Sequence, residues 1–123
     1  MLDKPVVAPH VGPAPDDLLI DDIVEGTGAE ATPGQTAVVH YVGVGATSGR
    51  EFDASWNRHE TFSFPLGAGH VIAGWDRGVV GMKVGGRRRL VIPSHLGYGA
   101  SGAGGVIAPH ETLIFVVDLI ELR

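Results

Sequence analysis

The sequence predicts an α+β fold in which one short helix is held against a β-sheet formed by most of the remaining chain. Only the stretch around Trp75 has helical spacing, whereas five or so other segments have strand composition and alternation. Nineteen Gly and eight Pro among 123 residues indicate many tight turns. A chain of this length forms one domain with a sizeable core.

The expected helix has an apolar face and is weak by itself. Its apolar residues recur at steps of three, four and three: Ile72, Trp75, Val79 and Met82. Gly74 and Gly78 interrupt it, and each costs roughly 1 kcal/mol relative to Ala. Isolated helices below about 12–15 residues are marginal in water. We therefore expect this helix to persist only because a sheet buries its apolar face.

The expected strands follow a leader of residues 1–15, which carries four prolines and is predicted to be flexible. Residues 16–123 form the folded domain. Its strands are predicted over 16–25, 36–44, 62–64, 87–92 and 112–122, and a turn at 45–50 leads into residues 51–53.

Two of these strands have informative faces. In 36–44, Ala37, Val39 and Tyr41 share one face, and His40 lies on the other. The strand over 112–122 is apolar on both faces, which predicts a central position in the sheet.

Composition excludes several classes of function. The net charge of −5 argues against a nucleic-acid or anionic-membrane partner, and the absence of Cys excludes disulfides and thiolate metal sites. No stretch approaches the ~20 apolar residues of a membrane span. The first residues lack the pattern of a signal peptide, so a cytoplasmic protein is expected.

Other motifs carry little chemistry. Residues 97–102 match G-x-G-x-x-G, but more Gly follows instead of a helix, so we interpret them as a flexible loop. The six His lack metal-ligand spacing, and no G-x-S-x-G is present, so neither a metal site nor a hydrolase triad is expected. The run Arg87–Arg89 is interpreted as solvated sheet surface.

The aromatic residues are the remaining anomaly, because they come from many different elements. Core packing explains any one of them, but burying seven would be difficult in so small a fold: Tyr41, Phe52, Phe62, Phe64, Trp75, Tyr98 and Phe115. Apolar clefts are the default ligand sites, so some of these residues are expected to line a cavity. Asp53, directly after Phe52, would be an unusual carboxylate beside these aromatic residues unless it has a role in the cavity.

Several motifs together resemble the FKBP-type peptidyl-prolyl isomerases, in the family's order and spacing over about residues 16–123. They include Val38-Val-His-Tyr-Val-Gly43, Phe52-Asp-Ala-Ser55, Phe62-Ser-Phe64, Val71-Ile72 with Gly74-Trp75, Tyr98-Gly99 and Pro109-His-Glu-Thr-Leu-Ile-Phe115. The chain is most similar to small single-domain bacterial members. The resemblance implies an antiparallel sheet of five or six strands wrapped around the Trp75 helix, with a proline pocket between them.

The resemblance also implies a set of site residues. Asp53, Tyr98 and Trp75 would act in catalysis, with Trp75 as the pocket floor and the other two as a polar rim. Arg58 would pair near Asp53. The residues that bind substrate would come from the walls, the entrance and the loop over the pocket: Tyr41, Phe52, Arg58, Phe62, Val71, Ile72, Ile107 and Phe115. His70 would contact a macrolide through its backbone.

An isomerase of this kind needs no cofactor and no nucleophile. Its expected partners are proline-containing peptides, unfolded or partly folded proteins, and rapamycin-like macrolide inhibitors. The alternative is a non-catalytic module of the same fold that binds proline segments or macrolides. The chain lacks a dimerising helix and a chaperone insertion known in relatives, so a monomer is expected.

Overall fold

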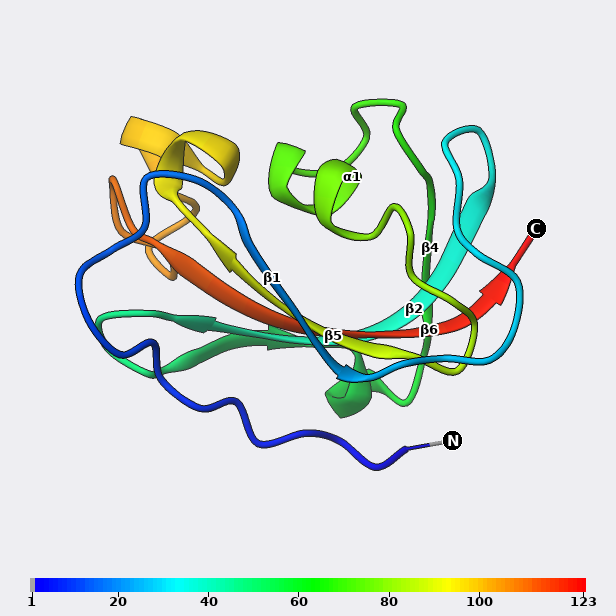
Figure 1. Cartoon of the computed structure of the whole chain (residues 1–123). Helices are drawn as coiled ribbons and strands as arrows, with labels where there is room; N and C mark the ends of the chain where they lie inside the picture. Colours follow the sequence, from blue (N-terminus) through cyan, green and yellow to red (C-terminus); the bar gives the residue numbers. More distant parts are fainter. Residues whose placement is uncertain (1) are drawn as a thin grey trace.

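Residues 2–123 are described here in a computed structural model, in which six strands form one antiparallel sheet (Figure 1). The strands run in the spatial order β1-β5-β6-β2-β3, and β4 pairs with the first half of β2. Their bounds are β1 Leu19–Val24, β2 Thr36–Gly45, β3 Glu51–Ala54, β4 Phe62–Pro65, β5 Arg87–Ile92 and β6 Leu113–Leu122. The predicted α+β fold is confirmed, and β6 has the central position expected of it.

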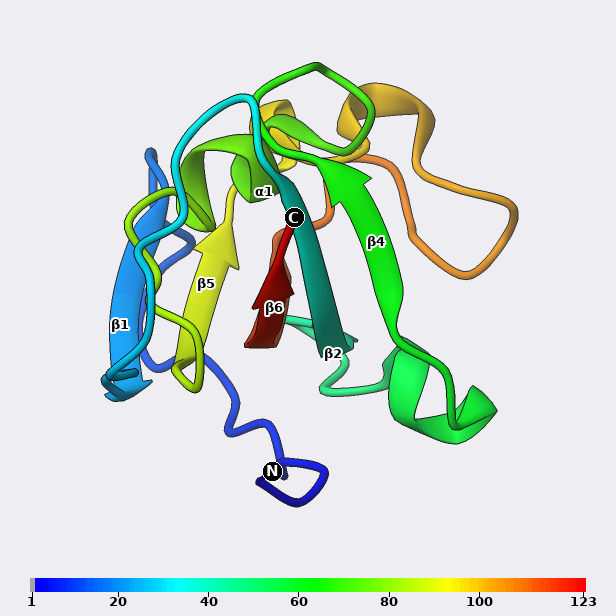
Figure 2. The same ribbon diagram turned by 90° about the vertical axis from the view of Figure 1, so that its right-hand side faces the viewer.

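One short helix, α1 (Ala73–Gly78), lies over the face of the sheet that we call the inner face (Figure 2). Tyr41 belongs to this face, and His40 to the opposite outer face. Three 3₁₀ turns that the sequence did not predict occur in the connections: η1 Ser55–Arg58, η2 Ser94–Leu96 and η3 Gly99–Ser101. Such turns are too short to leave a hydrophobic period in the sequence.

The two glycines of α1 bring the helix close to β5. A Cβ atom at Gly74 would lie 2.6 Å from Cγ2 of Ile92, and one at Gly78 would lie 2.7 Å from Cδ1 of Leu90. The weakness of the helix is therefore a consequence of tight packing on the sheet.

The arginine run is not the solvated surface that we predicted. Alternation turns Arg88 to the inner face, where its side chain is 10% exposed and pairs with Asp22 at 2.7 Å. Its Nη1 donates to the carbonyl oxygens of Gly78 and Val80 at the end of α1. A cation is favourable there because helix C-termini carry unpaired carbonyls. Arg87 forms an ion pair with Asp118 at 2.7 Å.

The sheet has apolar side chains on both faces. The larger cluster lies between the inner face and α1 and includes Trp75, Leu90 and Phe115. A smaller cluster on the outer face includes Val42, Val91 and Ile114. The strands β2 and β6 therefore contribute to two cores, which explains why their sequences are apolar almost throughout.

The leader crosses the outer face without forming a helix or strand (Figure 1). Val7 packs on the outer cluster, Lys4 pairs with Glu51 at 3.0 Å, and Arg89 donates to the carbonyl of Ala8 at 2.6 Å. These contacts were not predicted. The flexibility of the leader stays a prediction, and Met1 lies outside the described residues.

Over residues 2–123, no helix is long and apolar enough to cross a membrane. The same residues hold no cluster of three or more His, Asp or Glu placed to bind a metal ion.

Candidate functional site

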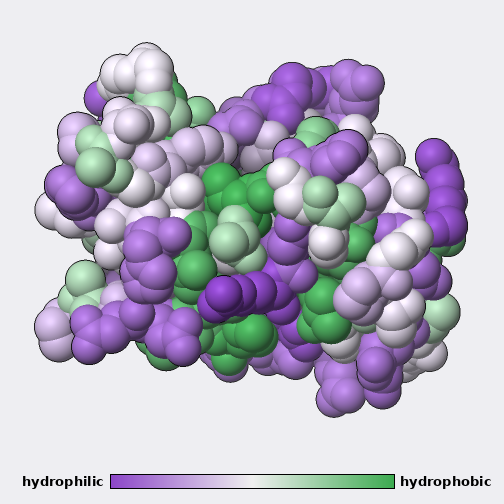
Figure 3. Space-filling view, turned by 90° about the horizontal axis from the view of Figure 1, so that it is seen from above, coloured by the Kyte–Doolittle hydropathy of each residue, from purple (hydrophilic) through white to green (hydrophobic). Residues whose placement is uncertain are grey.

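A cavity of about 440 Å³ opens between α1 and the inner face of the sheet. From the α1 side, hydrophobic residues gather in the middle of the surface with hydrophilic residues around them (Figure 3). The lining residues come from β2, β3, β4, β6, α1 and the loops beside them: Tyr41, Phe52, Asp53, Phe62, Gly69, His70, Val71, Ile72, Trp75, Tyr98 and Phe115.

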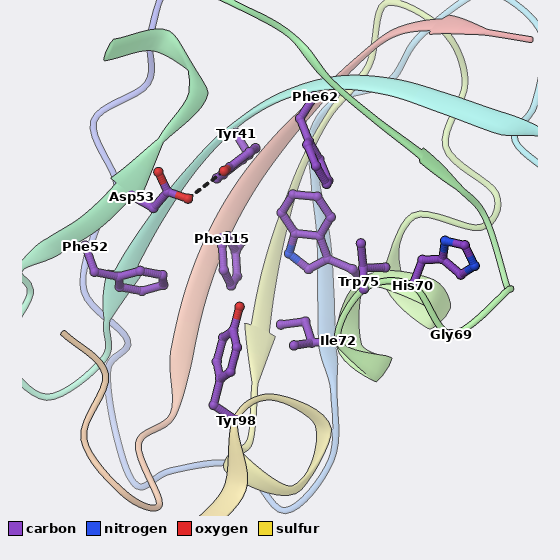
Figure 4. Close-up of a pocket in the computed structure, with 11 residues that line it drawn as sticks. Tyr41, Phe52, Asp53, Phe62, Gly69, His70, Ile72, Trp75, Tyr98 and Phe115 are labelled. Carbon is purple, nitrogen blue, oxygen red and sulfur yellow. Dashed lines mark hydrogen bonds between the residues drawn. The ribbon is translucent and has the colours of Figure 1, made fainter. Parts of the chain in front are cut away.

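Trp75 forms the floor of this pocket and is held edge-on by other rings (Figure 4). It is 4% exposed, and its ring lies 5.0 Å from that of Tyr41 and 5.3 Å from that of Phe115, both nearly perpendicular. Perpendicular aromatic pairs stabilise one another beyond the area that they bury. The floor and walls are therefore one interlocked cluster with little freedom to rearrange.

Gly43 of β2 makes room for the wall next to Phe115. A Cβ atom at this position would lie 2.6 Å from Cε1 of Phe115 and 2.7 Å from Cζ of Phe52. The two rings pack perpendicular to each other with centroids 5.5 Å apart. A strand glycine here marks a close approach of side chains, and it shapes one side of the cavity.

Three polar side chains close a triangle at the rim, which we call the rim triangle: Asp53, Tyr41 and Arg58. The Tyr41 hydroxyl donates to Asp53 Oδ2 at 2.6 Å, and Arg58 Nη1 donates to Asp53 Oδ1 at 2.6 Å. Arg58 Nη2 completes the triangle by donating to the Tyr41 oxygen at 2.9 Å. Each member thus holds the other two in place.

The triangle also sets the protonation of its members. Burial alone would raise the pKa of Asp53, but the hydrogen bonds from Tyr41 and Arg58 outweigh burial and lower this pKa. Burial, followed by the hydrogen bond to Asp53, raises the pKa of Tyr41. At neutral pH the rim therefore presents an ionised carboxylate whose charge is balanced by Arg58.

The loop between β4 and α1 forms the entrance. The Asp76 carboxylate accepts hydrogen bonds from the backbone N–H groups of Gly67 and Gly69, each at 2.9 Å. Asp76 directly follows Trp75, so one turn of α1 holds both the floor and the entrance. The sequence analysis missed Asp76, because a carboxylate on a helix is ordinarily explained by solvent exposure.

The cavity brings together all of the predicted site residues except Arg58 and Ile107. Arg58 acts on the rim through Asp53 and Tyr41, as its predicted pairing implied. Ile107 does not line the cavity but packs in the inner-face cluster with the pocket rings, and its contact with substrate stays a prediction. Backbone hydrogen bonds between Ile107 and Ala103 turn the loop back, which buries Ile107 in the core at 5% exposure and leaves Val106 at 64%.

Two lining residues fall outside that predicted set. The sequence suggested His70 only as a backbone contact, and its side chain borders the entrance. Gly69 carries no side-chain signal that could have identified it.

Comparisons with known proteins agree with this geometry. A protein-family model described as FKBP-type peptidyl-prolyl cis-trans isomerase matches residues 28–120. The chain is 62% identical to the FK506-binding protein of Streptomyces anulatus, with 98% of each chain covered. It is 52% identical to a probable FK506-binding protein of Corynebacterium glutamicum, covering 98% of this chain and 99% of the other.

Solved structures show the same likeness. The crystal structure of AtFKBP13 superposes with a TM-score of 0.81 at 39% identity, over 89% of this chain and 96% of that chain. FkpA from Escherichia coli superposes with a TM-score of 0.78 at 39% identity, over 86% of this chain and 48% of that chain.

Proposed function

The chain belongs to the FKBP-type peptidyl-prolyl cis-trans isomerases, and from that premise we propose how its pocket accelerates rotation about X–Pro bonds. The observation that carries the proposal is an aromatic cavity floored by Trp75 with an ion-paired rim beside it. The cavity supplies the apolar environment, and the rim supplies polar contacts at its edge.

The substrate's proline ring packs against the Trp75 indole, between the rings of Tyr41 and Phe115. The backbone N–H of Ile72, at the entrance, donates to a carbonyl of the bound peptide. These contacts orient the X–Pro bond and exclude water from it. The supporting observation is that the three rings form an interlocked floor and walls that need not move to receive the ligand.

The chemistry then follows from the nature of the amide bond. Resonance gives this bond a rotational barrier of about 18–20 kcal/mol, and twisting it removes the resonance and its charge separation. An apolar pocket disfavours the planar, charge-separated ground state more than the twisted transition state. A four-decade acceleration needs only about 5.4 kcal/mol of such differential stabilisation.

The rim positions the substrate and stabilises the twisted bond. Asp53, ionised and held by Tyr41 and Arg58, supplies a fixed negative charge at one side of the bond. The Tyr98 side chain reaches toward the pocket from the opposite side (Figure 4), and its hydroxyl donates a hydrogen bond to the substrate. Neither residue forms a covalent bond with the peptide.

We further propose that rapamycin-like macrolides occupy the same pocket and inhibit the enzyme. The similar proteins from Streptomyces anulatus and Corynebacterium glutamicum are named FK506-binding proteins, which supports this extension. The physiological substrates are proline-containing segments of unfolded or partly folded proteins, and the enzyme acts as a monomer.

A coupled assay on a proline peptide, with and without rapamycin, separates this proposal from a non-catalytic binding module. Catalysis that rapamycin suppresses supports both the isomerase mechanism and the shared pocket. Rapamycin binding by a protein that gives no rate enhancement would show a module that binds without turning over.

A further inference from the structure

We propose that His40, on the outer face of the sheet, is a positioning residue for isomerisation that acts through Ser55 on the rim triangle. This inference rests on the proposed function of the pocket. His40 and Tyr41 are neighbours on β2, so their side chains point to opposite faces. A contact on the outer face can thus set the geometry of the pocket on the inner face.

His40 is a buried histidine with a specific partner. The residue is 7% exposed, and Nδ1 lies 2.8 Å from the Ser55 hydroxyl oxygen. The indole of Trp56 stacks on the imidazole with centroids 4.3 Å apart and planes at 19°. The ring therefore has a single orientation, fixed by one hydrogen bond and one stacking contact.

Ser55 links this histidine to the rim triangle. Its side chain is fully buried, and its oxygen accepts the backbone N–H of Tyr41 at 2.7 Å. Ser55 also begins η1, the turn that ends at Arg58. One hydroxyl thus joins the backbone of Tyr41 to the element that carries Arg58. A shift of η1 against β2 would pull two corners of the triangle apart.

The proton of the Ser55 hydroxyl has two candidate acceptors. His40 Nδ1 lies at 2.8 Å and the carbonyl oxygen of Tyr41 at 3.4 Å, which is long for a hydrogen bond. The shorter distance joins Nδ1 and the Ser55 oxygen in one hydrogen bond, and either atom can be its donor. When Nδ1 is the donor, the Ser55 hydroxyl keeps the Tyr41 carbonyl as its acceptor, so the contact between His40 and Ser55 persists in both arrangements.

The surroundings of His40 favour the neutral ring. Burial lowers the pKa of His40, and the Asp118 carboxylate on β6 opposes this only in part. Asp118 faces His40 across the ladder, but Arg87 of β5 binds both of its oxygens, at 2.7 and 2.8 Å. The groups from η1, Ser55 and Trp56, are uncharged. At neutral pH the ring beside Ser55 is therefore held in its neutral form.

A matched pair of substitutions isolates the contact. His40→Asn keeps a polar atom near the position of Nδ1, whereas His40→Leu removes it at similar volume. We expect His40→Leu to lower kcat about fivefold with KM changed less than about twofold, since one hydrogen bond contributes about 1 kcal/mol. His40→Asn should retain most of the wild-type kcat. The exposed His95 on η2 supplies the control, and His95→Asn should behave as wild type.

A further measurement separates positioning from general stability. The amide proton shift of Tyr41 reports its bond to Ser55 and should move in His40→Leu but not in His95→Asn. In His40→Asn this shift should stay near its wild-type value, because the polar atom that contacts Ser55 is retained. A role in packing alone would change unfolding free energy without this effect.

The proposal is overturned if folded His40→Leu keeps kcat within twofold of wild type. It is also overturned if His40→Asn and His40→Leu lose activity equally and the Tyr41 amide shift stays in place. Should His40→Leu fail to fold, Ser55→Ala decides: a matching loss of kcat supports the proposal, and a wild-type kcat refutes it. A wild-type protein without turnover would instead refute the proposed function.

Discussion

Replacing Asp53 by Asn removes the negative charge of the rim while preserving its shape. The Asp53 and Arg58 side chains are 40% and 49% exposed, so their ion pair contributes only about 0–1 kcal/mol to stability. The bond from the Tyr41 hydroxyl survives in part, because an amide oxygen still accepts it. We expect the free energy of unfolding to fall by about 1–2 kcal/mol, from the lost ion pair together with one weakened hydrogen bond.

Asp53→Asn should also lower turnover, and this loss should be partial. If desolvation by the aromatic pocket provides most of the acceleration, losing the rim charge lowers kcat/KM about tenfold, or about 1.4 kcal/mol of transition-state stabilisation. Trp75→Ala, by contrast, should cost about 3–5 kcal/mol of stability and abolish binding along with activity. Asp21→Asn, on the exposed strand β1, is the matched control for loss of one carboxylate.

The assay combines a coupled peptide-isomerisation measurement with titration of a fluorescent macrolide. The expected result is reduced turnover by Asp53→Asn with macrolide affinity changed by less than about tenfold. Loss of all acceleration with binding intact would refute the reasoning, because it would require Asp53 to act as an acid or base.

The remaining predictions concern the helix, the entrance loop and pH. Gly78→Ala should destabilise the protein by about 1–3 kcal/mol in urea unfolding, because its Cβ meets Leu90, although alanine has the better helix propensity. The exposed Arg77→Ala serves as control. A stabilised Gly78→Ala would contradict the packing argument. Asp76→Asn should raise KM about fivefold with little change in kcat, because it loses one of the two hydrogen bonds that shape the entrance. An unchanged KM would exclude a role of Asp76 in shaping the entrance. The free energy of unfolding should fall as the pH drops below 6.5, because the unfolded chain then protonates His40 while the folded chain, with its lowered pKa, does not. His40→Asn should weaken this pH dependence. If chemical denaturation at several pH values gives the same dependence of unfolding free energy on pH in both proteins, His40 is not its source.

The elements with strong periodicity could be read from the sequence. The strand β5 has the predicted bounds, and β2 and β6 differ from the predicted strands by one residue at one end. Alternation in β2 correctly placed Tyr41 and His40 on opposite faces. The 3₁₀ turn η1 was missed because four residues leave no pattern. The inward turn of Arg88 was missed because three consecutive arginines look solvated until a helix end is placed beside one of them.

The residues of the site also divide into those that the sequence could identify and those that it could not. Motifs in the chain identified the aromatic rings and Asp53, since bulky apolar side chains and an isolated carboxylate leave visible signals. The burial of Ile107 could not be predicted, because the direction of its side chain depends on how the loop folds back onto Ala103. Asp76 and Ser55 were missed because their roles are hydrogen bonds to backbone groups distant in sequence.

The sequence by itself determined most strands, the one weak helix and most residues of the pocket, because local periodicity and side-chain chemistry are properties of the chain. Only the tertiary structure decided why Gly74 and Gly78 stand in that helix: they permit its approach to Ile92 and Leu90. It also decided that Tyr41, Asp53 and Arg58 close a triangle and that His40, on the far face, contacts Ser55, which bonds the backbone of Tyr41. Such relations depend on distances between segments, and these distances exist only once the sheet has formed.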